Sequence, residues 1–378
     1  MADADLFPSP FVSVRSSARA TAFHDRFTGQ QLVLAEPAGA ALAAVFRGEA
    51  AFKDFAAAHP AEAARAAGLS MVAAEPSPGP YLRAMLSSID VEPAGSCNAV
   101  CGMCPRSEMT RPKSVMAPET FEALCGQLEA SFPDVVRQVL FCGFGEPTQN
   151  PRLADMSRRV RRAAPRAVVS VISNGSLLTP ELVDALVRSE VDAFSCSFQS
   201  NTKRKYESIM RGLDYDVTVA GLRALLAAAR GTRLAVYINV TATDETVDEI
   251  PALVRTWEAQ GARVVVNPLH NRGGFLKLEG RFTGGGVGGG PVARCGLLNS
   301  RLFVSSEGDV LSCCHDLTAE TRLGNVRDEP LTDILLRRLD RIARSDLFRI
   351  CGTCTDDSAL SMVALPPPTA TGSAATGK

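Results

Sequence analysis

The sequence alternates strand-like and helix-like segments from Tyr81 to Asn267, and this alternation restricts the fold more than any other feature. Six short runs rich in Val, Ile and Phe read as strands: one ending at Val91, then 138–144, 167–173, 192–198, 233–240 and 262–267. Amphipathic helix patterns separate them, at 118–131, 151–163, 180–188, 217–229 and 246–260. Nearly continuous apolar strands joined by helices predict a parallel sheet that is buried on both faces.

The helix starts carry their own signals. Pro118, Pro151 and Pro180 fall where the first turn of a helix tolerates proline, and Thr179 is a candidate N-cap. A run of six strand–helix units is too short for an eight-stranded barrel, and by pattern alone it also fits an open doubly wound sheet. In such sheets the functional residues follow the carboxyl ends of the strands.

Three cysteines follow the first strand: Cys97, Cys101 and Cys104, in the stretch SCNAVCGMCPR. A C-x3-C-x2-C pattern supplies three thiolates, whereas each iron of a four-iron cluster needs an outside ligand, so one iron would stay open to a non-protein ligand. The alternative is a structural zinc site, but closed zinc sites take four ligands. The closest histidines on either side, His59 and His270, do not have zinc-site spacing relative to these cysteines.

The second strand runs into CGFGEPTQNP. Gly143 and Gly145 allow a close approach of another backbone, and Glu146 brings a carboxylate to the end of the strand. A glycine- and proline-containing turn is common after a strand, so this motif gains weight from its position one unit after the cysteines.

The cysteine pattern with the following CPR, the later M-x-P-E-x-F at Met116 to Phe121 and the GFGEP turn together resemble the radical S-adenosylmethionine (radical SAM) enzymes. The resemblance implies a partial (β/α)6 TIM-like barrel and a [4Fe-4S] cluster whose open iron binds SAM. It further implies reductive cleavage of SAM to a 5′-deoxyadenosyl radical, which abstracts hydrogen from a substrate. A flavodoxin- or ferredoxin-type electron donor is expected as a partner.

The resemblance also assigns cofactor-binding positions. It implies that Gly143, Gly145 and Glu146 bind the amino group of SAM. Asn174 and Ser197, after the third strand and at the end of the fourth, would face its ribose and carboxylate. Met103 stands where many relatives have an aromatic residue near the adenine. The chain departs from the family at Gln199, where many relatives have an acidic residue.

A second cysteine set lies downstream and comprises Cys295, Cys313, Cys351 and Cys354. Four thiolates can close a metal site completely, and zinc and iron–sulfur both suit them. With EGDVLSCC and LGNV nearby, the set resembles the auxiliary-cluster extension called SPASM in its short twitch form, which implies a second [4Fe-4S] cluster. Cys314 could replace Cys313 as ligand, or serve as a catalytic hydrogen-atom donor in an epimerase.

These features divide the chain. We expect a small α+β N-terminal region at 1–80 and a radical SAM core at 81–272. A glycine-rich linker at 273–294, a small C-terminal auxiliary-cluster domain at 295–362 and a disordered tail at 363–378 would follow. The N-terminal region faintly resembles the winged-helix element that grips peptide substrates, and a plain cap on the barrel is the alternative.

Composition excludes some partners. Forty basic and forty-one acidic residues give a net charge of -1, so we expect no nucleic-acid partner and no anionic membrane surface. The acidic N-terminus and the short apolar runs predict no signal peptide and no membrane span, hence a cytoplasmic protein. Eleven cysteines in a reducing compartment favour metal ligation over disulfides.

Two enzymatic functions stay open. One is the modification of a peptide, with the N-terminal region holding a leader segment. The other is a dehydrogenase or epimerase acting on a small molecule such as an aminocyclitol or a sugar. A zinc-binding scaffold without enzymatic activity is a distant third alternative.

Overall fold

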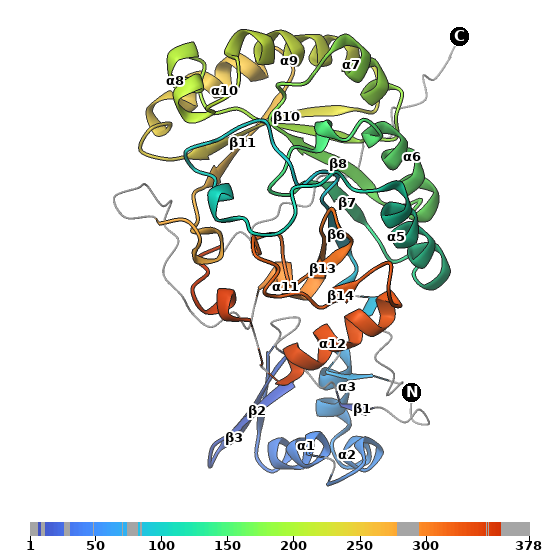
Figure 1. Ribbon diagram of the computed structural model, residues 1–378. Coiled ribbons are helices and arrows are strands. Elements are labelled where there is room, and N and C mark those ends of the chain that lie inside the picture. Colours follow the sequence, from blue (N-terminus) through green and yellow to red (C-terminus); the bar gives the residue numbers. More distant parts are fainter. Residues whose placement is uncertain are drawn as a thin grey trace, which may run out of the picture.

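The computed structural model describes residues 7–8, 12–25, 31–47, 49–69, 71–73, 82–83, 85–277, 295–344, 346 and 348–356. Its central part is a run of parallel strands that pair in chain order. These strands are β6 (Ser88–Val91), β7 (Gln138–Phe141), β8 (Val168–Ser173), β9 (Ala193–Ser197), β10 (Ala235–Ala242) and β11 (Arg263–Pro268). The predicted partial (β/α)6 barrel is thereby confirmed (Figure 1).

Helices return the chain between these strands and lie along the outer side of the sheet (Figure 1). They are α5 (Pro118–Ser131), α6 (Leu153–Ala163), α7 (Pro180–Val187), α9 (Tyr215–Ala229) and α10 (Ile250–Glu258). A short helix that the sequence pattern did not indicate, α8 (Lys203–Ile209), precedes α9. Alternate residues such as Val139 and Phe141 of β7 belong to the main hydrophobic core, whereas most residues of β11, the last barrel strand, are exposed.

The helix starts follow the expected local rules with one difference. Pro118 and Pro180 occupy the first turns of α5 and α7, and Thr179 caps α7 by accepting a hydrogen bond from the Leu182 N–H at 3.3 Å. Pro151 lies before α6 instead of in its first turn. The reason is local: residues 147–149 form a 3-10 turn, and the Asn150 side chain accepts from the Arg152 N–H at 2.9 Å.

The C-terminal segment extends the same sheet. After α11 (Gly296–Ser300), β12 (Arg301–Val304) pairs in parallel with β6, and β13 (Asp309–Leu311) and β14 (Gly324–Asn325) follow as antiparallel neighbours. Helix α12 (Leu331–Arg344) then packs near α5. One hydrophobic core therefore contains residues of both the barrel and this segment, for example Leu225 and Ile334.

The N-terminal unit has a core of its own. Strands β2 (Val12–Ser16), β3 (Ala20–Asp25) and β4 (Gln31–Ala35) form an antiparallel sheet in that order. Helices α1 (Ala38–Phe46), α2 (Phe52–Ala58) and α3 (Pro60–Gly68) follow, and β1 (Phe7–Pro8) pairs with β5 (Val72–Ala73). Phe23, Leu32 and Leu42 are fully or almost fully buried in a separate hydrophobic cluster.

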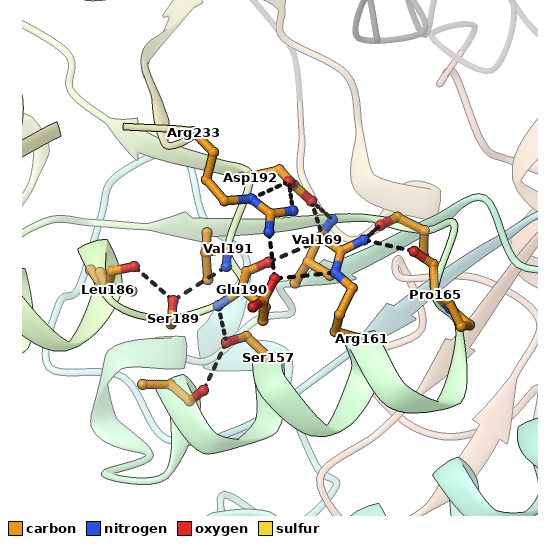
Figure 2. Close-up of polar contacts among 12 residues, drawn as sticks. Ser157, Arg161, Pro165, Val169, Leu186, Ser189, Glu190, Val191, Asp192 and Arg233 are labelled. Atoms are coloured by element: carbon orange, nitrogen blue, oxygen red, sulfur yellow. Dashed lines mark hydrogen bonds and ion pairs between the residues drawn. The ribbon is translucent and has the colours of Figure 1, made fainter. Parts of the chain in front are cut away.

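A polar network closes the end of the sheet at which β8, β9 and β10 begin (Figure 2). Asp192 accepts hydrogen bonds from Arg161 at 2.6 Å, from the Val169 N–H at 2.8 Å and from Arg233. Glu190 pairs with the same two arginines. Because this is the end opposite the carboxyl ends of the strands, we interpret the network as structural.

Two predicted segments fall largely outside the described residues. These are the glycine-rich linker at 273–294, of which only 273–277 are described, and the tail at 363–378. Within the described residues, no helix has both the length and the apolar character that crossing a membrane requires.

Candidate functional site

The first cysteine loop follows β6 and is held by a distant segment. The Val100 N–H donates to the Arg211 carbonyl at 2.7 Å, and the Gly102 N–H donates to the Ile209 carbonyl at 3.0 Å. The Cys101 sulfur lies 3.6 Å from the sulfur of Met210. The end of α8 and the residues after it therefore position this loop.

Cys97, Cys101 and Cys104 are free thiols, each partly buried. Burial raises the pKa of all three, and for Cys101 burial together with the charges of Cys104 and Cys97 raises the pKa to about 12. With raised pKa values these thiols keep their protons in the unloaded site, and a metal that binds them must displace those protons. The donor set therefore fits a metal group with one ligand position left open.

The turn after β7 is packed tightly against the chain beyond β6. A Cβ atom on Gly145 would lie 1.8 Å from the carbonyl oxygen of Ala94, and one on Gly143 would lie 2.5 Å from the Glu92 side chain. Only glycine allows this approach. The turn thus lies directly beside the residues that lead into the cysteine loop.

Glu146 is buried at the centre of this turn, with 2% exposure. Its carboxylate accepts hydrogen bonds from the Thr148 N–H and hydroxyl at 3.0 and 2.6 Å, from the Ser173 hydroxyl at 2.7 Å and from the Asn174 N–H at 2.7 Å. Burial raises its pKa, and these donors oppose that shift. Glu146 therefore ties the ends of β7 and β8 together.

Asn174 connects the same strand ends to the cysteine loop. Its side-chain amide donates to the Asn98 side chain at 2.9 Å, and Asn98 in turn donates to the Ser176 hydroxyl at 2.8 Å. Asn98 lies between Cys97 and Cys101 and was not among the predicted site residues. Its position inside the cysteine motif is the signal that could have identified it.

The other predicted cofactor positions vary in exposure. Ser197 and Met103 are partly exposed, at the end of β9 and within the cysteine loop. Gln199 is buried, with 3% exposure, and its side chain accepts from the Thr241 N–H at 2.9 Å. Gln199, which stands where many relatives have an acidic residue, therefore joins the end of β9 to β10.

The second cysteine set converges on one cavity. Its lining includes the four predicted thiols of Cys295, Cys313, Cys351 and Cys354. Cys314 is not among the lining residues, and its sulfur lies 4.0 Å from Nδ1 of His315. Burial raises the pKa of all four lining thiols, to about 11 for Cys351. Four partly buried thiols around one cavity fit a metal group without an open ligand position.

His315 and Asp356 also line this cavity, and His270 packs against His315; no sequence motif indicated any of the three. Nε2 of His315 lies 2.6 Å from a carboxylate oxygen of Asp356, and the rings of His270 and His315 are 4.8 Å apart. Burial lowers the pKa of His270 to about 3. Side chains from positions 270, 315 and 356 meet only through the fold, so no local pattern could predict them.

A buried ion pair joins the two cysteine regions. Arg111 pairs with Glu92 at the end of β6, and its Nε donates to the Asp316 carbonyl at 3.2 Å. The Thr110 N–H donates to the Leu317 carbonyl at 3.3 Å. The segment after Cys104 is therefore bonded directly to the segment after Cys313.

Two family models match the chain. One, described as the radical SAM superfamily, covers residues 91–256, and the other, described as the SPASM iron–sulfur cluster-binding domain, covers residues 295–355. The first implies SAM and a [4Fe-4S] cluster, and the second implies auxiliary iron–sulfur binding.

Curated relatives are distant. The tungsten-containing aldehyde ferredoxin oxidoreductase cofactor-modifying protein of Pyrococcus furiosus is 26% identical over 168 residues, and the match spans 44% of this chain and 46% of that relative. The chain thus matches about half the length of that protein. The S-adenosyl-L-methionine-dependent 2-deoxy-scyllo-inosamine dehydrogenase of Niallia circulans is 24% identical over 251 residues, 66% of this chain and 82% of the relative.

Solved structures share the fold. Streptococcus suis SuiB bound to precursor peptide SuiA has a TM-score of 0.52 at 14% identity, over 87% of this chain and 88% of that chain. BtrN in complex with AdoMet and 2-DOIA has a TM-score of 0.50 at 20% identity, over 72% of this chain and 94% of that chain.

Proposed function

Because the chain belongs to the radical SAM superfamily and carries a SPASM iron–sulfur domain, we propose that it is an enzyme that modifies a peptide by radical chemistry. Cys97, Cys101 and Cys104 would hold the cluster that binds SAM. When bound, the cluster and SAM supply a 5′-deoxyadenosyl radical that abstracts hydrogen from the substrate. The observation that carries the proposal is the convergence of the three thiols with the Gly143–Glu146 turn, through Asn98 and Asn174.

The residues at the strand ends have separate roles in this proposal. Gly143 and Gly145 would bring main-chain groups to the cofactor. Glu146 would hold this turn against the end of β8 through its hydrogen bond from the Asn174 N–H. Asn174, Ser197 and Met103 would line the remainder of the SAM site. Because these side chains come from different strands, the sheet fixes their separation before any cofactor binds.

The second site would hold an auxiliary [4Fe-4S] cluster on Cys295, Cys313, Cys351 and Cys354. The shared cavity supports Cys313 as the ligand in preference to Cys314. Cys314 then remains a free thiol next to His315. A flavodoxin- or ferredoxin-type protein would supply the electron for SAM cleavage.

The N-terminal unit supports a peptide substrate. Strand β4 is an edge of its sheet among the described strands, and Val33 on it is 54% exposed. An extended peptide can add to such an edge through main-chain hydrogen bonds. SuiB, which shares the fold over most of this chain, has been solved with a precursor peptide.

A second candidate is the oxidation or epimerisation of a small polar molecule. The similarity to the dehydrogenase of Niallia circulans favours this function. The barrel strands also carry polar side chains: Asp90 pairs with Arg301 at 2.5 Å, and Asn239 donates to the Ser195 hydroxyl at 2.6 Å. In an epimerase, Cys314 would return a hydrogen atom to the substrate radical.

The deciding experiment incubates the reconstituted protein with a reductant, SAM and either candidate precursor peptides or aminocyclitols. A peptide-dependent rise in 5′-deoxyadenosine with a change in peptide mass supports the main proposal. A loss of two mass units from an aminocyclitol supports the alternative dehydrogenase, and an unchanged mass with inverted configuration supports an epimerase. Stoichiometric zinc without sulfide would contradict both and favour a zinc scaffold.

Variants separate the chemistry from peptide binding. Changing any of Cys97, Cys101 or Cys104 to Ala should abolish SAM cleavage. Val33→Asp should weaken peptide binding severalfold, measured by fluorescence anisotropy, and leave peptide-independent SAM cleavage intact. The matched control is Val217→Asp, since Val217 is 56% exposed on α9. Equal peptide binding by both variants would contradict a role for the β4 edge.

A further inference from the structure

Arg338 of α12 is a completely buried arginine beside the second cysteine set, with 0% exposure. Its Nη2 carries two hydrogens and shares them among four main-chain carbonyls, those of Leu297 at 2.9 Å, Arg301 at 2.7 Å, Ser312 at 3.3 Å and Leu298. Leu297, Leu298 and Ser312 line the cavity that the four cysteines share. The guanidinium is therefore bonded to main-chain groups of residues that line the cavity, while Arg338 lies directly behind that lining.

The other nitrogens of this guanidinium are unsatisfied. Nε and Nη1 of Arg338 have no hydrogen-bond partner within the described part of the chain, and the same holds for the buried hydroxyl of Ser312. Leaving a buried charged donor without a partner is strongly destabilising. A native fold tolerates this arrangement when an anionic group that binds later completes it.

The nearby groups that can become negatively charged are the cysteines, once their thiols lose their protons. Burial lowers the pKa of Arg338 to about 10, and the Cys313, Cys295 and Cys351 thiolates oppose this shift. Arg338 therefore stays protonated at neutral pH. A positive charge in a site from which water is excluded acts strongly on any charge that develops there.

We propose that Arg338 is the buried counter-charge of the auxiliary cluster and that it raises the cluster's reduction potential. This inference rests on the proposal that Cys295, Cys313, Cys351 and Cys354 hold an iron–sulfur cluster. Four thiolates make such a cluster anionic, and reduction by one electron adds a further negative charge. A fixed cation stabilises the more negative state, and net charge and hydrogen bonds to sulfur are among the factors that set cluster potentials.

The test isolates the auxiliary site by changing Cys97, Cys101 and Cys104 to Ala, so that reconstitution fills only the second site. Midpoint potentials are measured by redox titration followed by electron paramagnetic resonance, together with iron and sulfide content. Arg338→Gln should lower the midpoint potential by about 59 mV. For one electron this corresponds to a tenfold decrease in the equilibrium constant for reduction of the cluster. Arg338→Lys keeps the charge and should retain most of the wild-type potential.

The matched control is Arg337→Gln, on the same helix, because Arg337 is 48% exposed and pairs with Glu329. Its midpoint should equal the wild-type value. An Arg338→Gln protein with about four irons per chain and a wild-type midpoint would overturn the proposal while leaving the auxiliary cluster intact. Stoichiometric zinc without sulfide would overturn both.

If Arg338→Gln does not accumulate as folded protein, Arg338→Met replaces it as the uncharged variant. A midpoint lower in Arg338→Met than in Arg338→Lys supports the role of the charge. Equal midpoints in the Met and Lys variants contradict that role, because only the Lys variant keeps the positive charge.

Discussion

Gly145 is the position at which the smallest chemical change should have the largest effect. Gly145→Ala places a methyl group 1.8 Å from the Ala94 carbonyl oxygen, so the turn after β7 must move away from the cysteine loop. We expect loss of SAM binding and a fall in stability of about 2 kcal/mol or more. Isothermal titration and urea unfolding measure these two effects.

The control for this prediction is Gly126→Ala in the middle of α5. Beyond its chain neighbours and the backbone of its own helix, no atom lies within 4 Å of a Cβ placed there, so alanine should stabilise the protein by up to about 1 kcal/mol. Similar stability losses for both variants would show that the close approach at Gly145 is not the cause.

Asp90 should give the protein a pH-dependent stability. Burial raises its pKa from 3.8 to about 6, although Arg301 opposes the shift. The folded state therefore binds this proton more tightly than the unfolded chain does, and the contribution of Asp90 to stability decreases as the pH rises from 5 to 7. The linkage amounts to ~1 kcal/mol over this interval.

Urea unfolding at pH 5 and pH 7 measures this effect as the difference between two free energies. In Asp90→Asn that difference should change by ~1 kcal/mol relative to wild type. Asp184→Asn, an exposed carboxylate paired with Arg188, is the control and should match the wild type. A wild-type pH response in Asp90→Asn would refute the prediction.

The site residues that were predicted from the sequence stand in contiguous motifs. The metal-type cysteines and the Gly143–Glu146 turn stand in short patterns with a chemical reason. The full set of bonds made by Glu146 was not predictable, because its partner Asn174 is 28 positions away. Arg338 was hidden for a different reason: a helix pattern with several arginines gives no sign of which one is buried.

At the scale of elements, the network around Asp192 joins α6 to the beginnings of β8, β9 and β10 (Figure 2). Asp192→Ala leaves Arg161, Arg233 and the Val169 N–H without their shared acceptor. Since Asp192 is only 11% exposed, we expect a loss of about 2 to 3 kcal/mol.

The comparison for this prediction is Asp184→Ala, which removes an exposed pair within α7. That change should cost less than about 0.5 kcal/mol. Chemical denaturation of both variants provides the measurement, and equal losses would mean that the network does not act as a joint between elements.

The strong periodicity of apolar residues made most helices and strands predictable, but the residues at which they begin and end were harder to predict. The strands β7 to β11 and helices α5 and α7 lie where the pattern placed them. Helix α8 was missed because only Tyr206 and Ile209 of its residues are buried, which leaves too short an apolar stripe to recognise. The pairing of β12 with β6 was equally hidden, because register between strands 213 residues apart has no local signal.

At the scale of the whole molecule, the two hydrophobic cores predict two cooperative units. The barrel and the C-terminal segment share one core, and the N-terminal unit has its own. Amides of Leu225 and Ile334 should therefore lose hydrogen-exchange protection together as denaturant rises, and the amide of Leu42 should lose it in a separate step. A single step for all three would contradict this division.

The joint made by Arg111 and Glu92 has a consequence for how such a chain can evolve. It joins the segment after Cys104 to the segment after Cys313 through side-chain and main-chain hydrogen bonds. Strand β12 also pairs with β6, next to Glu92. The separation of the two sites is therefore set by this joint and not by the length of chain between residues 277 and 295. Insertions or deletions in that stretch can accumulate without changing the distance that an electron would travel between the sites.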